Sequence, residues 1–251
     1  MANPTAAMLV IGDEILSGRT QDTNTNHLAG RLTEAGIDLR EVRVVADVQD
    51  EIVAAVNALR ARYSYVFTSG GIGPTHDDIT ADAVAAAFGV GIDVREDARA
   101  ILMKNYRSED ELNPARLRMA RIPDGAALID NPVSLAPGFR LENVHVMAGV
   151  PAIFEAMVAS VLPTLTGGAP LLSWSFRFDR PEGAVAAPLA EIAETYPDLS
   201  FGSYPSVRDG RFGTSIVIRG ADRPRLAAGA GAVRALAEEM GVPSAAERAP
   251  D

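Results

Sequence analysis

The sequence lacks cysteine, and this absence excludes two kinds of structure at once. Without a thiol, the chain of 251 residues can form neither a disulfide framework nor a thiolate metal site. The absence of disulfides fits a reducing compartment, so we expect a cytoplasmic protein. Residues 1–5 carry no positively charged segment of a signal peptide, and no apolar run is long enough to cross a bilayer.

Positive charge is scarce as well, since 23 Lys and Arg residues stand against 33 Asp and Glu residues. The resulting net charge of −10 argues against a broad nucleic-acid-binding surface, which needs clustered positive charge. Hydrophobic residues make up 47% of the chain and charged residues 22%, as in an ordinary soluble globular protein. We therefore expect a small molecule as the ligand, and neither a nucleic acid nor a membrane as a partner.

Strand-like and helix-like segments alternate over residues 1–166. A continuous apolar run such as residues 6–11 predicts a buried parallel strand, and apolar residues at helical spacing predict the helices between strands. This alternation is typical of an α/β fold with a mostly parallel sheet and right-handed crossovers. The expected segments are strands over 6–11, 37–45, 63–67 and 144–148, helices over 24–35, 49–62, 81–88, 95–107 and 152–162, and an irregular hairpin within 128–140.

The pattern changes after residues 163–170, which are rich in Gly, Pro and Thr and resemble a linker. A strand over 172–178, a helix over 185–196, a hairpin with an Asp209-Gly210 turn and a helix over 225–240 predict a small α+β module. We therefore divide the chain into a domain of residues 1–166, a module of residues 167–242 and a disordered tail of residues 243–251.

The stretch 68–80, TSGGIGPTHDDIT, joins a predicted strand to a predicted helix. A glycine-rich turn of this kind presents backbone N–H groups and the positive end of a helix dipole to an anion. Glycine also lets the anion come close, because no Cβ is in the way. We predict that Ser69, Gly70, Gly71 and Gly73 bind a phosphate-bearing ligand. The alternative is a tight turn with no ligand, which we disfavour because α/β folds bind ligands in loops at the carboxyl ends of strands.

Two aspartates close this stretch. Asp78 is expected to cap the following helix by accepting a hydrogen bond from the amide of Thr80 or Ala81, which leaves Asp77 facing the ligand. Carboxylates beside phosphate-binding amides suit a divalent cation that bridges ligand and protein. His76, between them and the glycines, is treated as a bystander, because a histidine in an exposed loop seldom has a role.

Acidic residues also follow the other predicted parallel strands. Because such loops meet at one edge of a sheet, we expect Glu14, Asp22, Asp47, Asp77 and Asp78 to share a site. A hard cation such as Mg²⁺, Mn²⁺ or Co²⁺ would relieve their repulsion, and we predict Asp77, Asp78 and Glu14 as its ligands. Alternatively, some of these acids are helix caps on a solvated rim. Weaker signals come from Asn131 and Ser134 as contacts to a base or sugar, and from Arg116, Arg118 and Arg121 as phosphate contacts or a solvated helix face.

Four motifs in order give the chain a family resemblance. The segments IGDEIL (11–16), DTN (22–24), VVAD (44–47) and GGIGPTHDDIT (70–80) together resemble the molybdopterin-binding-like domain of the competence/damage-inducible protein A family. The THDD wording is most similar to the form fused to eukaryotic FAD synthases, and GSYP (202–205) resembles the module that follows there. The resemblance covers about residues 5–165 and implies a three-layer MoaB/Mog-like α/β fold and a homo-oligomer, either dimer or trimer.

The resemblance also implies functional residues. In the cofactor-synthesis enzymes of this fold, aspartates at the positions of Asp78 and Asp47 serve molybdopterin adenylylation, so we predict Asp47, Asp77 and Asp78 as catalytic residues. The family segment Leu-Pro-Gly-Val-Pro is here MAGVP (147–151), which retains the glycine. The remaining ligand contacts are predicted at Gly12, Glu14, Asp22, Asn24, Thr75, Thr80 and Gly149.

The related branches point to a reaction. They are associated with metal-dependent hydrolysis of nucleotide pyrophosphates such as ADP-ribose or FAD. We therefore expect metal-dependent hydrolysis of a nucleotide diphosphate linkage, with a divalent cation as cofactor and molybdopterin as a further candidate ligand. The alternatives are a molybdopterin- or nucleotide-binding protein without turnover, and a molybdopterin adenylyltransferase of molybdenum cofactor biosynthesis.

Overall fold

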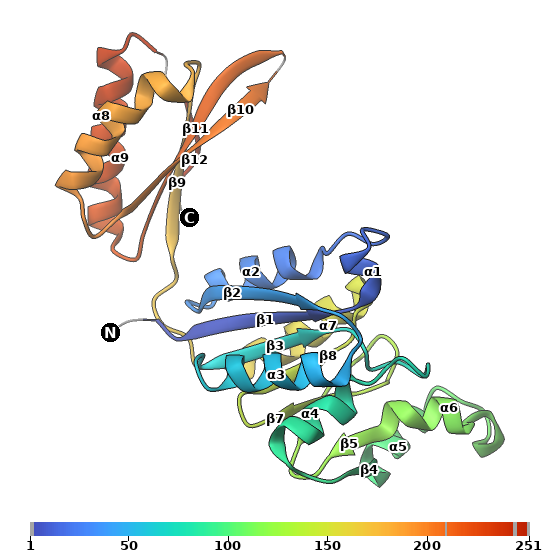
Figure 1. Ribbon diagram of the computed structural model, residues 1–251. Coiled ribbons are helices and arrows are strands. Elements are labelled where there is room, and N and C mark those ends of the chain that lie inside the picture. Colours follow the sequence, from blue (N-terminus) through green and yellow to red (C-terminus); the bar gives the residue numbers. More distant parts are fainter. Residues whose placement is uncertain (1–2, 209, 243–244, 250–251) are drawn as a thin grey trace. The chain divides into compact units, whose positions relative to one another are not determined.

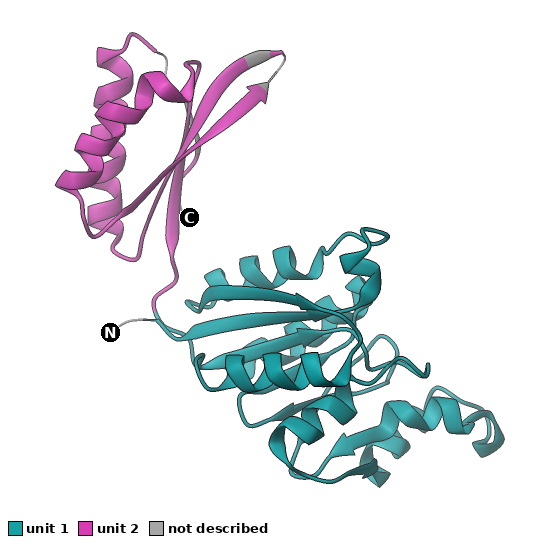
Figure 2. Cartoon of the chain, in the orientation of Figure 1, with its two compact units in different colours: residues 1–168 teal, residues 169–251 magenta. Residues whose placement is uncertain are grey.

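The computed structural model describes residues 3–208, 210–242 and 245–249. The chain forms two compact units, Met1–Gly168 and Ala169–Asp251 (Figure 2). The strands of the first unit are β1 (Thr5–Ile11), β2 (Asp38–Val45), β3 (Tyr65–Ser69), β4 (Ile92–Val94), β5 (Arg121–Pro123), β6 (Ala127–Ile129), β7 (Gly138–Leu141) and β8 (Val144–Met147). Its helices are α1 (Asp13–Leu16), α2 (Asn24–Glu34), α3 (Gln49–Arg60), α4 (Thr80–Phe88), α5 (Glu96–Met103), α6 (Pro114–Leu117) and α7 (Pro151–Val161), with 3-10 turns η1 (Glu109–Glu111), η2 (Arg118–Ala120) and η3 (Leu162–Thr164).

The first unit is built on a six-stranded sheet in the order β2-β1-β3-β8-β7-β6 (Figure 1). Strands β2, β1, β3 and β8 are parallel, and β7 and β6 continue the sheet in antiparallel pairing. The expected mostly parallel α/β sheet is confirmed, as is the hairpin expected within residues 128–140. Because β1, β3 and β8 are parallel, the loops that follow them leave the sheet at the same edge.

Helices cover both faces of this sheet, which confirms the three-layer arrangement. On one face α2 and α7 bury Leu28, Leu32 and Phe154 in a core with Met8 and Phe67. On the other face α3 and α4 contribute to a second core that contains alternate residues of the same strands. The continuous apolar run of β1 follows from this arrangement, since a parallel strand covered on both faces has no side chain in water.

Two short elements differ from expectation. The helix expected over residues 95–107 ends at Met103, and a small antiparallel sheet of β4 and β5 lies beside it. Strands of three residues are too short to show an alternating pattern, so periodicity did not indicate them.

The second unit contains β9 (Leu172–Phe178), α8 (Glu182–Thr195), β10 (Ser200–Arg208), β11 (Arg211–Gly220), α9 (Arg223–Glu239) and β12 (Ala245–Arg248). Its sheet has the order β10-β11-β9-β12, and α8 and α9 pack on one face around Phe176, Ile216 and Val233. The expected α+β module is confirmed, although Asp209 of the predicted turn lies outside the described residues. The prediction of a disordered tail was wrong for Ala245–Arg248, because this segment pairs with β9 as an edge strand of the sheet. The rest of that prediction at residues 243–244 and 250–251 lies outside the described residues.

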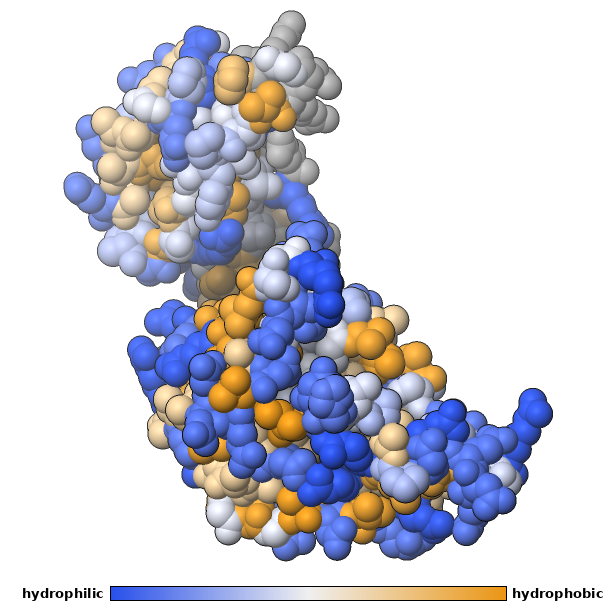
Figure 3. Space-filling view, turned by 45° about the vertical axis from the view of Figure 1, so that its right-hand side comes forward, coloured by the Kyte–Doolittle hydropathy of each residue, from blue (hydrophilic) through white to orange (hydrophobic). Residues whose placement is uncertain are grey.

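Polar side chains are interspersed with small apolar patches on the face shown in Figure 3. Over the ranges that the structure describes, no helix combines the length and the apolar character needed to traverse a bilayer.

Candidate functional site

The glycine-rich loop runs from the end of β3 to the start of α4. Gly70 and Gly71 have φ angles of 107° and 69°, in the region that side chains disfavour. Thr80 closes the loop: its amide donates to the carbonyl of Gly71 over 2.9 Å, and its hydroxyl donates to that of Gly70 over 3.0 Å. Thr80 is fully buried, and its hydroxyl holds the loop closed; the ligand contact predicted for it stays a prediction.

The loop glycines are also required by close packing. A Cβ on Gly70 would overlap the carbonyl oxygen of Ile11, and a Cβ on Gly71 would overlap the Thr80 hydroxyl. Gly149, which follows β8, would place a Cβ 3.2 Å from the Cα of Gly70. The two strand-glycine-helix junctions therefore lie side by side, and each leaves room for the other.

The amides of the loop are not equally available. The N–H of Gly70 donates to the carbonyl of Met147 over 3.2 Å, so its predicted contact to a ligand phosphate does not hold for the amide. The N–H groups of Gly71 and Gly73 make no hydrogen bond to any described residue. Among the three glycines, Gly71 and Gly73 are therefore the ones whose amides can donate to an anion.

A cavity of about 560 Å³ lies over this loop, and we call it the glycine-loop pocket. Pockets of this size accept ligands the size of a nucleotide. The predicted site residues that line it are Glu14, Gly70, Gly71, Gly73, Asp78 and Gly149. Sequence reasoning missed its apolar wall and one hydroxyl, because nothing in the pattern sets them apart from core residues: Thr20, Ile72, Met119, Ala148, Val150 and Ile153.

A smaller hollow of about 50 Å³ adjoins the pocket and is lined by the predicted residues Asp22, Asn24 and Ser69. Asn24 is buried, and its Nδ2 donates to Ser69 Oγ and to the carbonyl of Gly149, both over 2.8 Å. Its Oδ1 has no partner among the described residues. Asp22 accepts from the amide of Thr25 over 3.1 Å, so it caps the start of α2, as the alternative interpretation expected.

Asn24→Asp should lower the free energy of unfolding by about 2 kcal/mol, because the hydrogen bond that Nδ2 donates to the Gly149 carbonyl is replaced by a buried carboxylate oxygen facing that carbonyl oxygen. Urea unfolding followed by circular dichroism measures this loss. Asn26→Asp, at an exposed position on the same helix, is the matched control and should change the stability by less than about 0.5 kcal/mol. Equal losses in the two variants would contradict the bridging role of Asn24.

The carboxylate of Asp78 is held above the glycine loop. Its Oδ2 accepts from the amide of Thr75 over 2.7 Å and from the Thr75 hydroxyl, and it lies 2.7 Å from where a Cβ on Gly73 would be. The helix cap expected at Asp78 is wrong, because α4 begins after Ile79 without a side-chain cap. The loop bends the carboxylate back over Gly73 instead. Thr75 serves to hold it there.

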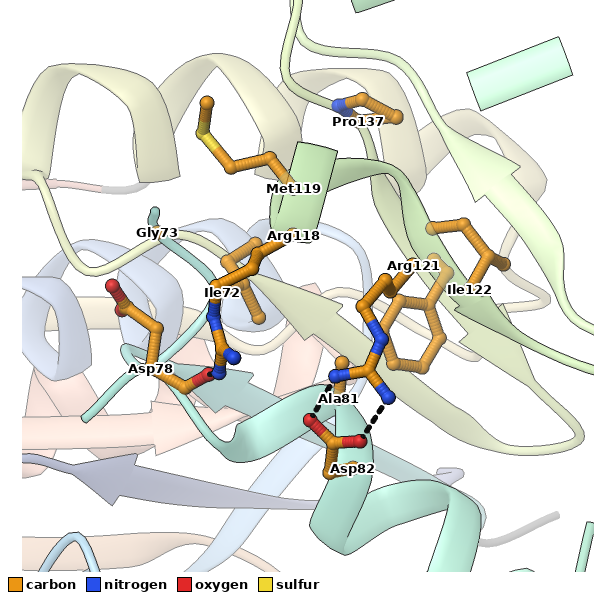
Figure 4. A pocket seen from close by; sticks show the side chains of 12 residues that line it. Ile72, Gly73, Asp78, Ala81, Asp82, Arg118, Met119, Arg121, Ile122 and Pro137 are labelled. Atoms are coloured by element: carbon orange, nitrogen blue, oxygen red, sulfur yellow. Dashed lines mark hydrogen bonds and ion pairs between the residues drawn. The ribbon is translucent and has the colours of Figure 1, made fainter. Parts of the chain in front are cut away.

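A hollow of about 20 Å³ is lined by Asp78 and by two of the arginines considered above, Arg118 and Arg121 (Figure 4). Arg118 donates to the backbone carbonyl of Asp78 over 2.9 Å. Arg121 forms a bidentate pair with Asp82 through contacts of 2.8 and 2.6 Å. Both guanidinium groups therefore support the loop and α4, and the phosphate contacts considered for them are not supported.

Asn131 is likewise occupied within its own loop. Its Oδ1 accepts from the amides of Val133 and Ser134, and its Nδ2 donates to Ser134 Oγ and to the carbonyl of Ala136. The Ser134 hydroxyl accepts in this set of hydrogen bonds, so its own hydrogen can still be donated to a ligand. The predicted base or sugar contact therefore rests on Ser134. Both residues line the glycine-loop pocket.

The remaining acids lie around Asp47. Asp47 Oδ2 accepts from the amide of Asp13 over 3.0 Å. Partial burial raises the pKa of Asp47, the Asp13 amide opposes this, and the charges of Asp13, Glu14 and Asp77 raise the pKa further. The side chain of Asp77 is 63% exposed. The charges of Asp13, Glu14 and Asp77 thus act on Asp47, and a site shared by Glu14, Asp22, Asp47, Asp77 and Asp78 stays a prediction.

Asp47→Asn should leave the free energy of unfolding at neutral pH unchanged or raise it, by less than about 1 kcal/mol for a half-exposed group. The folded protein holds the Asp47 proton more tightly than the unfolded chain, whose pKa is 3.8, so wild-type stability falls as the pH rises through the raised pKa. Urea titrations below pH 3.8 and at neutral pH measure the difference. A variant that loses more stability at neutral pH than in acid would contradict this sign.

The carboxylates do not form a preformed metal cage. Within residues 3–208, 210–242 and 245–249, no group of three or more His, Asp or Glu side chains is arranged to hold a metal. The carboxylate of Glu14 lies over Gly12, where a Cβ would be 2.6 Å from Glu14 Oε2, and Asp77 points into solvent. Of the three predicted ligands, Glu14 and Asp78 line the glycine-loop pocket. Mg²⁺ commonly binds through one or two carboxylates together with phosphate oxygens of a substrate, so a cation site at these residues stays a prediction.

Comparison with known protein families matches the two units separately. Residues 7–167 match the family described as "Probable molybdopterin binding domain". Residues 170–245 match the family described as "FAD synthase, middle domain". The boundary between the two compact units, at Gly168 and Ala169, lies between these two matches.

Individual relatives agree with these matches. A protein of Pyrobaculum calidifontis is 35% identical over 212 residues, which cover 80% of this chain and 81% of that protein. A CinA-like protein of Citrifermentans bemidjiense is 41% identical over 167 residues, covering 64% of this chain and 40% of that protein. The crystal structure of the protein CinA, of unknown function, from Thermoplasma acidophilum is similar with a TM-score of 0.59 and 36% identity over 64% of this chain and 98% of that one.

Proposed function

The chain belongs to the probable molybdopterin binding domain family, with CinA-like relatives, and on that premise we propose that it hydrolyses the diphosphate linkage of a nucleotide in the glycine-loop pocket. ADP-ribose and FAD represent the substrate class, in which two phosphates join a nucleoside to a second group. The observation that carries the proposal is the pocket itself: free amides of the glycine loop and the carboxylates of Glu14 and Asp78 line one cavity of about 560 Å³.

Each part of the pocket has a task in this reaction. The amides of Gly71 and Gly73 bind the oxygens of the diphosphate, helped by the positive end of α4. A divalent cation bound by carboxylate and phosphate oxygens would supply charge neutralisation. Asp78, whose Oδ2 is fixed by Thr75, orients a water molecule and accepts its proton as the water oxygen attacks phosphorus and the bridging P–O bond breaks. The apolar wall holds the group beyond the diphosphate and keeps bulk water out.

One observation favours a second function, which is binding without turnover. Within the described residues no three His, Asp or Glu side chains are arranged to hold a metal, so a cation would depend on phosphate oxygens of the ligand for the rest of its coordination. In that case the same amides would hold a molybdopterin or nucleotide phosphate, and Asp78 would serve only to shape the loop.

A substrate screen separates the two functions. Purified protein is incubated with ADP-ribose, FAD and related dinucleotides in the presence of Mg²⁺, Mn²⁺ or Co²⁺, and the release of AMP is measured. Hydrolysis is expected to require the cation and to disappear with EDTA. Binding of these compounds without AMP release would instead support the binding function, and ATP consumption that depends on molybdopterin would support adenylyl transfer.

A further inference from the structure

The strand β2 leaves one edge of the main sheet open. It is the outermost strand in the order β2-β1-β3-β8-β7-β6, and among the described residues only β1 pairs with it (Figure 1). An edge strand presents a row of backbone N–H and C=O groups that can pair with a strand of another chain. The residues along this edge therefore decide whether a second strand fits there.

The hydrogen bonds of β2 show which of its backbone groups face the open edge. The carbonyl of Val45 accepts from the amide of Gly12 over 3.1 Å, so the backbone groups of Val45 point toward β1. The register of β2 against β1 is regular from residue 41 to residue 45, and successive residues of a strand point their backbone groups to opposite edges. Val42 and Val44 therefore turn their N–H and C=O groups outward.

The same two valines expose apolar side chains. Val42 and Val44 are 43% and 38% exposed. They pair with Met8 and Val10, which belong to the core beneath α2, so both valines lie on that face of the sheet. Lys and Pro are common protections of an exposed edge strand, and β2, with the sequence DLREVRVV, contains neither.

The opposite face of β2 carries a pair of opposite charges. Glu41 and Arg43 pair with Ala7 and Leu9, which belong to the core beneath α3. Arg43 Nε donates to Glu41 Oε1 within the strand. The side chains of Glu41 and Arg43 remain 22% and 37% exposed, which leaves each of them accessible to a second partner of opposite charge.

These charges favour one register of β2 against a second copy of itself. In an antiparallel pair with its two-fold axis at Val42, Glu41 of each copy lies opposite Arg43 of the other. Moving the axis by one residue sets Glu41 opposite Glu41 or Arg43 opposite Arg43. Opposite charges stabilise an antiparallel pair, and like charges directly opposite destabilise it. Of these three registers, only the one at Val42 also places outward-facing N–H and C=O groups at the axis.

We propose that the chain forms a two-fold symmetric dimer in which the β2 strands of two copies pair antiparallel about Val42. The N–H and C=O groups of Val42 bond to those of the other copy, and the two Val42 side chains meet on the face beneath α2. On the other face, Glu41 and Arg43 of both copies form a ring of alternating charges. The resemblance of the sequence left dimer and trimer open, whereas a strand that pairs with itself about a two-fold axis closes as a dimer.

The test measures self-association of the full chain by sedimentation equilibrium, which should show monomer and dimer in equilibrium. Val42→Lys should raise the dissociation constant about tenfold or more, because two like charges meet at the axis. Val133→Lys is the matched control, since Val133 is 57% exposed and lies outside the strands, and it should leave the dissociation constant unchanged. Deuterium exchange at the Val42 amide should slow as the protein concentration rises. No residue of β2 lines the glycine-loop pocket, so these readouts do not depend on hydrolysis.

An exchange of charges tests the register. Glu41→Arg and Arg43→Glu should each remain monomeric alone, because like charges then face each other across the axis. An equimolar mixture of the two variants should form a heterodimer, in which every Arg faces a Glu. The proposal is overturned if the wild type stays monomeric up to its solubility limit, if Val42→Lys associates as tightly as the wild type, or if the mixture does not associate. Backbone amide spectra of each variant verify that it is folded.

Discussion

Gly70→Ala is expected to lower the free energy of unfolding by about 3 kcal/mol or more, because two costs add. An alanine at a φ of 107° is strained, and its Cβ would overlap the carbonyl oxygen of Ile11, which sits at the buried end of β1. Neither Gly70 nor the Ile11 carbonyl can move without distorting the main chain, because this contact involves backbone atoms. Urea unfolding midpoints measure the loss, and soluble yield gives a first indication of it.

Gly18→Ala is the matched control for this substitution. Gly18 also has a positive φ, 72°, but a Cβ there would meet no atom within 4 Å. It should therefore cost only the conformational strain, about 1–2 kcal/mol. The difference between the two variants isolates the close approach of the loop to β1. If Gly70→Ala were no more damaging than Gly18→Ala, the loop would not be packed as described.

Asp78→Asn is expected to reduce the rate of diphosphate hydrolysis about 100-fold or more while the protein remains folded. The amide of Thr75 can still donate to the Oδ1 of an asparagine, so the geometry of the loop is kept, but the side chain no longer accepts a proton from water. Steady-state release of AMP at saturating substrate and cation gives the rate. Binding of a non-hydrolysable dinucleotide, measured by calorimetry, should weaken far less than the rate falls.

Asp110→Asn is the matched control for that change, since Asp110 is an exposed carboxylate in the same unit and does not line the glycine-loop pocket. It should hydrolyse substrate at the wild-type rate. A rate for Asp78→Asn within about threefold of this control would rule out a catalytic carboxylate at position 78 and would leave ligand binding as the function of the pocket.

Helices and strands with a strong hydrophobic pattern could be predicted from the sequence, whereas strands that form only because another segment pairs with them could not. The apolar run of β1 and the helical spacing of Leu28 and Leu32 follow from burial on two faces or one, so the parallel sheet and its helices could be predicted. The strand at Ala245–Arg248 forms because β9 has a free edge, which no local pattern reveals. The three-residue strands β4 and β5 depend on each other in the same way.

In the candidate site, too, the residue types could be predicted from the sequence, whereas their hydrogen-bond partners could not. Glycines between a strand and a helix predicted a pocket, and eight of the residues selected from sequence line it, with the weaker candidates Asn131 and Ser134 among them. The helix cap predicted at Asp78 was wrong, and the loop-closing role of Thr80 was not predicted, because both depend on where the loop folds back: Asp78 turns toward Thr75, and Thr80 donates to Gly70.

The contact between the two glycine junctions has a consequence for how the pocket opens. The loop after β3 and the loop after β8 are joined by the Gly70 amide on the Met147 carbonyl, by Asn24 between Ser69 and the Gly149 carbonyl, and by the close approach of Gly149 to Gly70. Neither segment can swing outward without breaking all three ties. The floor of the cavity therefore moves as one rigid unit, and the hydrogen-bonded amides of both loops, such as that of Gly70, should exchange with deuterium at a common rate, through a single opening event.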